Sequence, residues 1–253
     1  MDVLLVYVGF CAVLVGFISI IKPLKFLKIR SRRMGTAVLL SGLGLAIVAM
    51  TWPVGLKQAT GNHRRIDDFL PAYHFHEIHS IRIHAPPDRV FRAIKAVTPQ
   101  EILFLRPLLE IRQFPERLQG KPSTPLPAEP ILEAFVDSGF LLLAEELNQE
   151  IALGTTGQII ESESDEPPPE IDSPQAFVAL KDPGYAKVVM TIYIEDEGED
   201  SSRVTTETRI FANDPATLKR FAAYWRVIYP GSAILRITWL WAINQRVQDG
   251  APK

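Results

Sequence analysis

Two long runs of apolar residues open the chain, at positions 3–21 and 34–52, and neither contains a charged side chain. An α-helix rises about 1.5 Å per residue, so each run is long enough to cross a hydrocarbon core about 30 Å thick. The first run follows Met1-Asp2 rather than the cations that begin a signal peptide, and a second run comes after it. The pattern predicts a hairpin of two membrane-spanning helices over residues 1–53, with the bilayer as a partner.

Small residues recur along one side of each run. They are Gly9, Ala12, Gly16 and Ser19 in the first run, and Gly35, Gly42, Ala46 and Ala49 in the second. Such stripes allow two helix backbones to approach closely, which favours direct packing of the two helices. The alternative interpretation is that small residues are simply common in membrane helices.

The loop between the two runs is strongly basic. Its cations are Lys22, Lys25, Lys28, Arg30, Arg32 and Arg33. Short loops rich in Lys and Arg stay on the cytoplasmic side of a membrane. We therefore expect a multi-pass protein of the cytoplasmic (inner) membrane whose remaining residues are extracytoplasmic, although Lys57, Arg64 and Arg65 argue for the opposite orientation.

Beyond the hairpin, the pattern becomes that of a folded domain. Residues 54–72 are polar and contain Gly and Pro, which predicts a linker. Residues 75–84 alternate between apolar and polar positions and predict a strand, which Pro86-Pro87 end. A helix with an apolar face of Val90, Phe91 and Ile94 follows, and a second helix is predicted over about 99–111.

The middle of the domain combines turns with further apolar segments. A Pro-rich loop at 115–130 precedes a predicted short helix and a hairpin that turns near Asn148-Gln149. Residues 161–174 are acidic and rich in proline, which predicts a solvated loop. Residues 177–211 offer three strands, separated by turns at 182–184 and 197–198.

A long helix is predicted at the end of the chain. Asn213-Asp214-Pro215 combines a capping side chain with a proline in the first helical turn. Apolar residues then recur at helical spacing and predict a face that packs on the sheet. They are Leu218, Phe221, Ala222, Trp225 and Ile228. Pro230-Gly231 should kink or break this helix, which resumes at Ser232 and continues to about residue 247, leaving 249–253 as a tail.

Composition and motifs exclude several classes of function. A net charge of −2 gives no reason to expect nucleic acid as a partner, and the single cysteine, Cys11, allows no intrachain disulfide. The five histidines lie between positions 63 and 84, but His79 points away from His74 and His76, and no HExxH spacing occurs. Neither a metal nor a cofactor is predicted, and the sequence shows no Gly-rich phosphate loop, Ser/His/Asp set or cysteine nucleophile.

One predicted strand, 203–211, carries two charges on the same face. Side chains alternate along a strand, so Glu207 and Arg209 share a face with Phe211, whereas Val204 and Ile210 lie on the other. If the charged face meets water, the pair forms part of a cross-strand charge ladder that contributes about 0.5 kcal/mol to stability. If it faces inward, the two charges must be paired, and they then suit a polar ligand head group.

The order of these elements resembles that of the START-like, or SRPBCC, superfamily. The resemblance covers roughly residues 70–248 and is carried by four segments: HSIRIHAPPDRVFRAI, SGFLLLAEELNQEIALGTTG, FVALKDPGYAK and VTTETRIFANDPATLKRFAAYWRVIYPGSAILR. These segments are similar to an uncharacterised bacterial branch in which TETR recurs as a unit. The resemblance implies an α+β helix-grip fold for residues 73–248, in which a curved antiparallel sheet wraps around a long C-terminal helix.

The resemblance also implies a class of function. Members of the superfamily include lipid carriers, ligand receptors, polyketide cyclases and folding accessories. We expect a membrane-anchored domain that binds a hydrophobic or amphipathic small molecule, such as a lipid from the adjacent bilayer, without chemistry. The candidate ligand-binding residues are His79, Glu150, Glu207, Arg209, Phe221 and Trp225. An enzyme of the cyclase or dehydratase type that uses the four polar residues is the alternative, and a structural membrane module is a third. The sequence indicates neither the ligand nor the oligomeric state.

Overall fold

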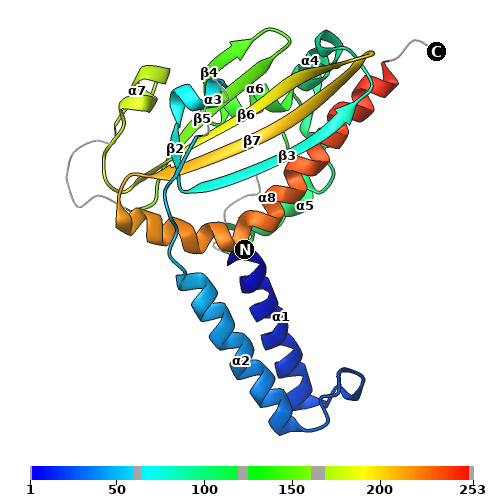
Figure 1. The fold of residues 1–253 in the computed structure, drawn as a ribbon, viewed down its shortest axis with the longest axis vertical. Coiled ribbons are helices and arrows are strands. Elements are labelled where there is room, and N and C mark those ends of the chain that lie inside the picture. The colour runs from blue at the N-terminus through cyan, green and yellow to red at the C-terminus, as the bar shows by residue number, and fades with distance from the viewer. Residues whose placement is uncertain (1, 60–63, 119–124, 161–168, 251–253) are drawn as a thin grey trace. The chain divides into compact units, whose positions relative to one another are not determined.

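The computed structural model describes residues 2–59, 64–118, 125–160 and 169–250 (Figure 1). The chain forms two compact units. The first consists of Met1–Gly55 and Lys219–Tyr229, and the second of Leu56–Leu218 and Pro230–Lys253. The long terminal helix thus contributes residues to both units. The domain boundaries predicted from the sequence had assigned the whole of this helix to the domain 73–248.

The first unit contains the apolar hairpin. Helices α1 (Asp2–Ile21) and α2 (Arg32–Thr51) are both long and apolar enough to cross a membrane. The stripes of small residues lie where the two helices meet: a Cβ atom added at Gly9 would lie 2.8 Å from the backbone nitrogen of Ala46, and one added at Gly42 would lie 2.7 Å from that of Val13. Glycine at these positions is therefore required for the close approach of the two helices.

The residues of the terminal helix that belong to this unit make polar contacts with the hairpin. Arg226 donates to the backbone carbonyls of Met50 (2.8 Å) and Trp52 (2.5 Å) at the end of α2, and Tyr7 donates to the carbonyl of Val227. The last carbonyls of a helix have no partner within the helix itself. Arg226 supplies partners at this end of α2.

The second unit is built on a five-stranded antiparallel sheet. The spatial order is β3-β7-β6-β5-β4, and the strands are β3 (Phe75–Ile83), β4 (Leu141–Glu146), β5 (Glu150–Gln158), β6 (Tyr185–Gly198) and β7 (Ser201–Ala212). A separate two-stranded ribbon joins β1 (Lys57–Gln58) to β2 (Ala72–Tyr73). Together with the long helix α8 (Pro215–Asp249), this arrangement confirms the predicted α+β fold.

Shorter helices and 3-10 turns connect the strands. They are α3 (Arg65–Phe69), α4 (Pro87–Ala96), η2 (Pro99–Glu101), α5 (Leu105–Leu118), α6 (Ile131–Asp137) and α7 (Pro174–Ala179), and the basic loop of the hairpin contains η1 (Lys25–Leu27). The predicted strand at 75–84, the helix after Pro86 and the hairpin that turns near Asn148 are all confirmed. Asp214 caps α8 as predicted, because its side chain accepts from the backbone nitrogens of Ala216 and Thr217.

Three predictions about local structure were wrong. The expected linker 54–72 contains α3, which packs on the sheet, and the first of the three strands expected in 177–211 is instead helix α7, which Ser173 caps and Pro174 begins. Helix α5 continues to Leu118. Of the kink or break expected at Pro230-Gly231, the break is absent, because α8 runs as one helix from Pro215 to Asp249 with Pro230 inside it. The acidic loop predicted at 161–174 lies outside the described residues for its first eight positions.

Each face of the sheet is covered by its own apolar core. On one face, Met190, Ile192 and Val204 pack in a cluster with Leu240 and Ile243 of α8 and with α4. On the other face, a smaller cluster joins the sheet to α3 and α7. Its buried members are Ile66, Leu70, Tyr73, Leu143, Ala152, Phe177 and Val189. We call the first the α8 face and the second the α3 face.

Candidate functional site

The pairing register of β7 decides which face its polar side chains occupy. Glu207 lies opposite Thr191 of β6, and Arg209 lies opposite His76 of β3. Residues directly opposite each other in an antiparallel pair share a face. Glu207 and Arg209 therefore lie on the α3 face, whereas Val204, two residues before Thr206, packs in the α8 core.

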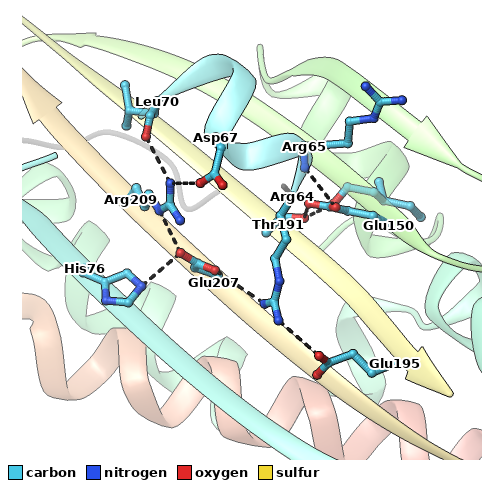
Figure 2. Close-up of polar contacts among 11 residues, drawn as sticks. Arg64, Arg65, Asp67, Leu70, His76, Glu150, Thr191, Glu195, Glu207 and Arg209 are labelled. Atoms are coloured by element: carbon cyan, nitrogen blue, oxygen red, sulfur yellow. Dashed lines mark hydrogen bonds and ion pairs between the residues drawn. The ribbon is translucent and has the colours of Figure 1, made fainter. Parts of the chain in front are cut away.

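Glu207 and Arg209 form the centre of a buried ion-pair network (Figure 2). Arg209 donates through Nε to Glu207 (2.7 Å) and through Nη1 to Asp67 of α3 (2.6 Å) and to the carbonyl of Leu70 (3.2 Å). The two residues are only 4% and 6% exposed. The interpretation that placed them on a water-facing surface was wrong, because α3 covers them and supplies their partners.

Glu207 also contacts His76 and Arg64. His76 Nε2 lies 3.0 Å from Glu207 Oε1, and Arg64 Nη1 lies 3.9 Å from Oε2 (Figure 2). Burial alone would raise the pKa of Glu207, but the hydrogen bond from His76 and the charge of Arg209 outweigh it and hold the pKa below its usual range. Glu207 is therefore ionised at neutral pH and already paired within the protein.

Glu150 belongs to the same assembly. Its Oε1 accepts from the hydroxyl of Thr191 (2.6 Å), and its Oε2 accepts from the backbone nitrogen of Arg65 at the start of α3 (3.2 Å). The structure thus brings three of the predicted site residues together: Glu150, Glu207 and Arg209. All three bind neighbouring protein groups, and Glu150 and Arg209 hold α3 at its two ends.

His79 lies on the opposite, α8 face. Its Nε2 is 2.9 Å from Glu77 Oε1, and Ser232 of α8 donates to Glu77 Oε2 (2.7 Å). Arg236 lies near this group; burial lowers its pKa, and the charge of Glu77 acts against that shift. A carboxylate that orients an imidazole is an arrangement used for acid–base chemistry. Of the four polar residues that the enzyme alternative uses, His79 is the one that has this arrangement.

Phe221 and Trp225 lie in the part of α8 that belongs to the first unit. Their rings are stacked with centroids 6.2 Å apart, and Trp225 makes an edge contact with Tyr229. Their expected role in lining a ligand cavity stays a prediction.

A cleft on the α3 face was not predicted from the sequence. Its volume is about 460 Å³, and its walls come from the end of α3, the end of α7 and the sheet. The lining residues are Phe69, Leu70, Pro71, Ala72, Val178, Leu180, Lys181, Lys187, Phe211 and Asn213. Apolar side chains make up most of the lining, and two lysines contribute the charge.

The signal for this cleft in the sequence is Lys187. It stands in a β6 segment that is otherwise largely apolar, and alternation places it on the face of Thr191 and Tyr193. Because 177–180 was predicted to be a strand and 54–72 a linker, the two walls that enclose this lysine were not expected.

A second hollow, also of about 460 Å³, lies beside α8 and η2. It has a more polar lining that includes Glu101, Asn244 and Gln245. Glu101 is already bound by Arg246 at 2.7 Å. Across the described parts of the chain, no group of three or more His, Cys, Asp or Glu side chains is placed to hold a metal ion.

Comparisons with known proteins do not define a family. No family model matches the chain, and no curated protein matches it. Similar solved structures include protein MLL2253 from Mesorhizobium loti (13% identity, TM-score 0.32, 70% of this chain and 100% of that chain) and TTHA0849 from Thermus thermophilus (12%, 0.27, 70% and 100%). A third is hypothetical protein jhp0584 from Helicobacter pylori (11%, 0.34, 75% and 98%). At these values the likeness supports neither a family nor a function.

Proposed function

We propose that this protein is a membrane-anchored, START-like domain that binds a hydrophobic or amphipathic small molecule without chemistry. The observation that carries the proposal is the cleft on the α3 face. Small-molecule sites are concave, mainly apolar and typically about 300–1,000 Å³ in volume. The cleft has this character, with a volume of about 460 Å³ and an apolar lining that includes Phe69, Leu180 and Phe211.

This proposal places the ligand outside the space beneath the terminal helix. On the α8 face, Met190 and Ile192 of the sheet pack with Leu240 and Ile243 of α8 in one apolar core. Arg209 and Glu150 then act as positioning residues, because they hold α3 and the Leu70 wall of the cleft against the sheet. They contribute to binding through the shape of the cleft.

The membrane anchor explains how such a ligand would be supplied. An apolar hairpin tethers the domain to a bilayer, which is a store of amphipathic molecules. The basic loop between α1 and α2 favours a cytoplasmic location for that loop and an outer location for the domain.

A reporter fused after Lys253 tests this orientation. Alkaline phosphatase at this position should be active and a fluorescent protein that folds only in the cytoplasm should be dark, because an even number of spans returns the chain to the outer side. Replacing the six cations of the loop with glutamine should weaken or reverse this pattern. Strong cytoplasmic fluorescence from the unaltered chain would show that the orientation is inverted.

Filling the cleft tests ligand binding. Val178 lines the cleft and is 44% exposed, so Val178→Trp adds volume there without disturbing a buried core. Val136 on α6 is 45% exposed, and Val136→Trp is the matched control. After gentle purification, each protein is extracted and the extract is analysed by mass spectrometry. We expect wild type and Val136→Trp to retain an amphipathic molecule. The amount of this molecule should be about tenfold or more lower in Val178→Trp. The same molecules in the same amounts from all three proteins would refute the proposal. Lipids that bind around the hairpin should be present in all three extracts, so they do not account for a difference.

A further inference from the structure

The cleft contains a buried cation. Lys187 of β6 lines it and is only 7% exposed. Its Nζ lies 5.8 Å from the centre of the Phe177 ring, and Lys181 lines the same cleft from the segment after α7. A charge that is removed from water is costly unless it is paired and hydrogen-bonded. Lys187 therefore differs from an ordinary surface lysine.

The ammonium group of Lys187 has hydrogen-bond donors left for a ligand. Its ammonium group donates to the carbonyl of Val178 at 3.2 Å. An ammonium group has three donors, and among the described residues no carboxylate forms an ion pair with this one. Arg209, on the same face, is by contrast paired with both Glu207 and Asp67. Burial, together with the charge of Lys181, lowers the pKa of Lys187, so an anion beside it would favour its charged form.

We infer that the cleft selects an anionic amphiphile with a single acyl chain, whose carboxylate binds Lys187 and Lys181 while its chain lies along Phe69, Val178 and Phe211. This inference rests on the proposed function and adds the chemical class of the ligand. The lining supplies both parts of the complementarity: two lysines, close enough for the charge of Lys181 to act on Lys187, and apolar side chains over most of the remainder. A charge-assisted hydrogen bond to a carboxylate is among the stronger polar contacts available in proteins.

Photolabelling of the full-length protein tests the inference. The protein is placed in phosphatidylcholine nanodiscs and exposed to a diazirine analogue of palmitic acid or, in parallel, to the methyl ester of the same probe. The labelled peptides are then identified and quantified by mass spectrometry. Lys187→Met removes the charge and keeps an unbranched side chain, Lys187→Arg keeps the charge, and Lys95→Met removes an exposed lysine that pairs with Glu145 on another part of the domain.

The acid probe should label the peptides that contain residues 69–72 and 178–181. Lys187→Met should reduce this labelling about tenfold, the scale of one charge-assisted hydrogen bond, whereas Lys187→Arg should retain most of it and Lys95→Met should retain all of it. The ester should label the same peptides several-fold less and should not respond to Lys187→Met. The comparison of acid with ester needs only the wild-type protein. It therefore tests selection by charge even where a variant fails to fold.

Two results would overturn the inference in different ways. Equal labelling of these peptides by acid and ester, with no effect of Lys187→Met, would exclude selection by charge and leave the proposed function standing. Absence of labelling at these peptides by either probe would exclude both the inference and the proposed function.

Discussion

Arg209→Leu should lower the free energy of unfolding by about 3–5 kcal/mol, because removing one partner of a buried ion pair leaves an uncompensated charge in the interior. Arg209 is the shared partner of Glu207, Asp67 and the Leu70 carbonyl. Its loss removes a cationic partner from both Glu207 and Asp67 and releases the end of α3 that Arg209 holds. Pulse proteolysis of the full chain over a denaturant series measures the change.

Arg106→Leu is the control for this experiment. Arg106 pairs with Glu110 one turn along α5, and its side chain is 78% exposed. Exposed pairs of this kind contribute about 0.5 kcal/mol or less. A similar loss of stability in both variants would contradict the structural role assigned to the buried network.

Leu240→Ala should cost about 2–5 kcal/mol, because it opens a cavity in the core between α8 and the sheet. Leu240 is 2% exposed and lies in the same cluster as Ile243 and Met190. The next residue, Trp241, is 51% exposed on the other side of the helix. Trp241→Ala removes a larger side chain but should cost less than about 1 kcal/mol.

The same denaturant series compares the two variants. The smaller substitution should have the larger effect, which only a difference in burial explains. If Trp241→Ala destabilised the protein more than Leu240→Ala, the face of α8 that packs on the sheet would be misassigned.

Much of the fold could be predicted from local sequence patterns. The apolar runs of the hairpin, the alternation in β3 and the capping residue Asp214 each depend on near neighbours in sequence, and each was read correctly. Helices α3 and α7 are five and six residues long. Helices this short gain little from their own hydrogen bonds and depend on tertiary packing. The sequence around them was accordingly assigned to a linker and a strand.

The site was predicted only in part, for a related reason. Alternation along β7 shows that Glu207 and Arg209 share a face, but it does not show which element covers that face. Their partner Asp67 lies in α3, 142 positions before Arg209, within a segment predicted to be a linker. The cleft depends on the same missing elements, because its walls are the ends of α3 and α7.

Hydrogen exchange in the presence of ligand tests the central claim most directly. The full-length protein in nanodiscs is compared with and without dodecanoate and, in parallel, dodecan-1-ol, and exchange is followed by mass spectrometry. Binding in the cleft predicts slower exchange confined to peptides that cover 69–73 and 177–181, which form the walls at the ends of α3 and α7. Protection confined instead to peptides of β3 and of residues 235–247 in α8 would place the ligand on the α8 face, and no protection with either compound would contradict binding itself.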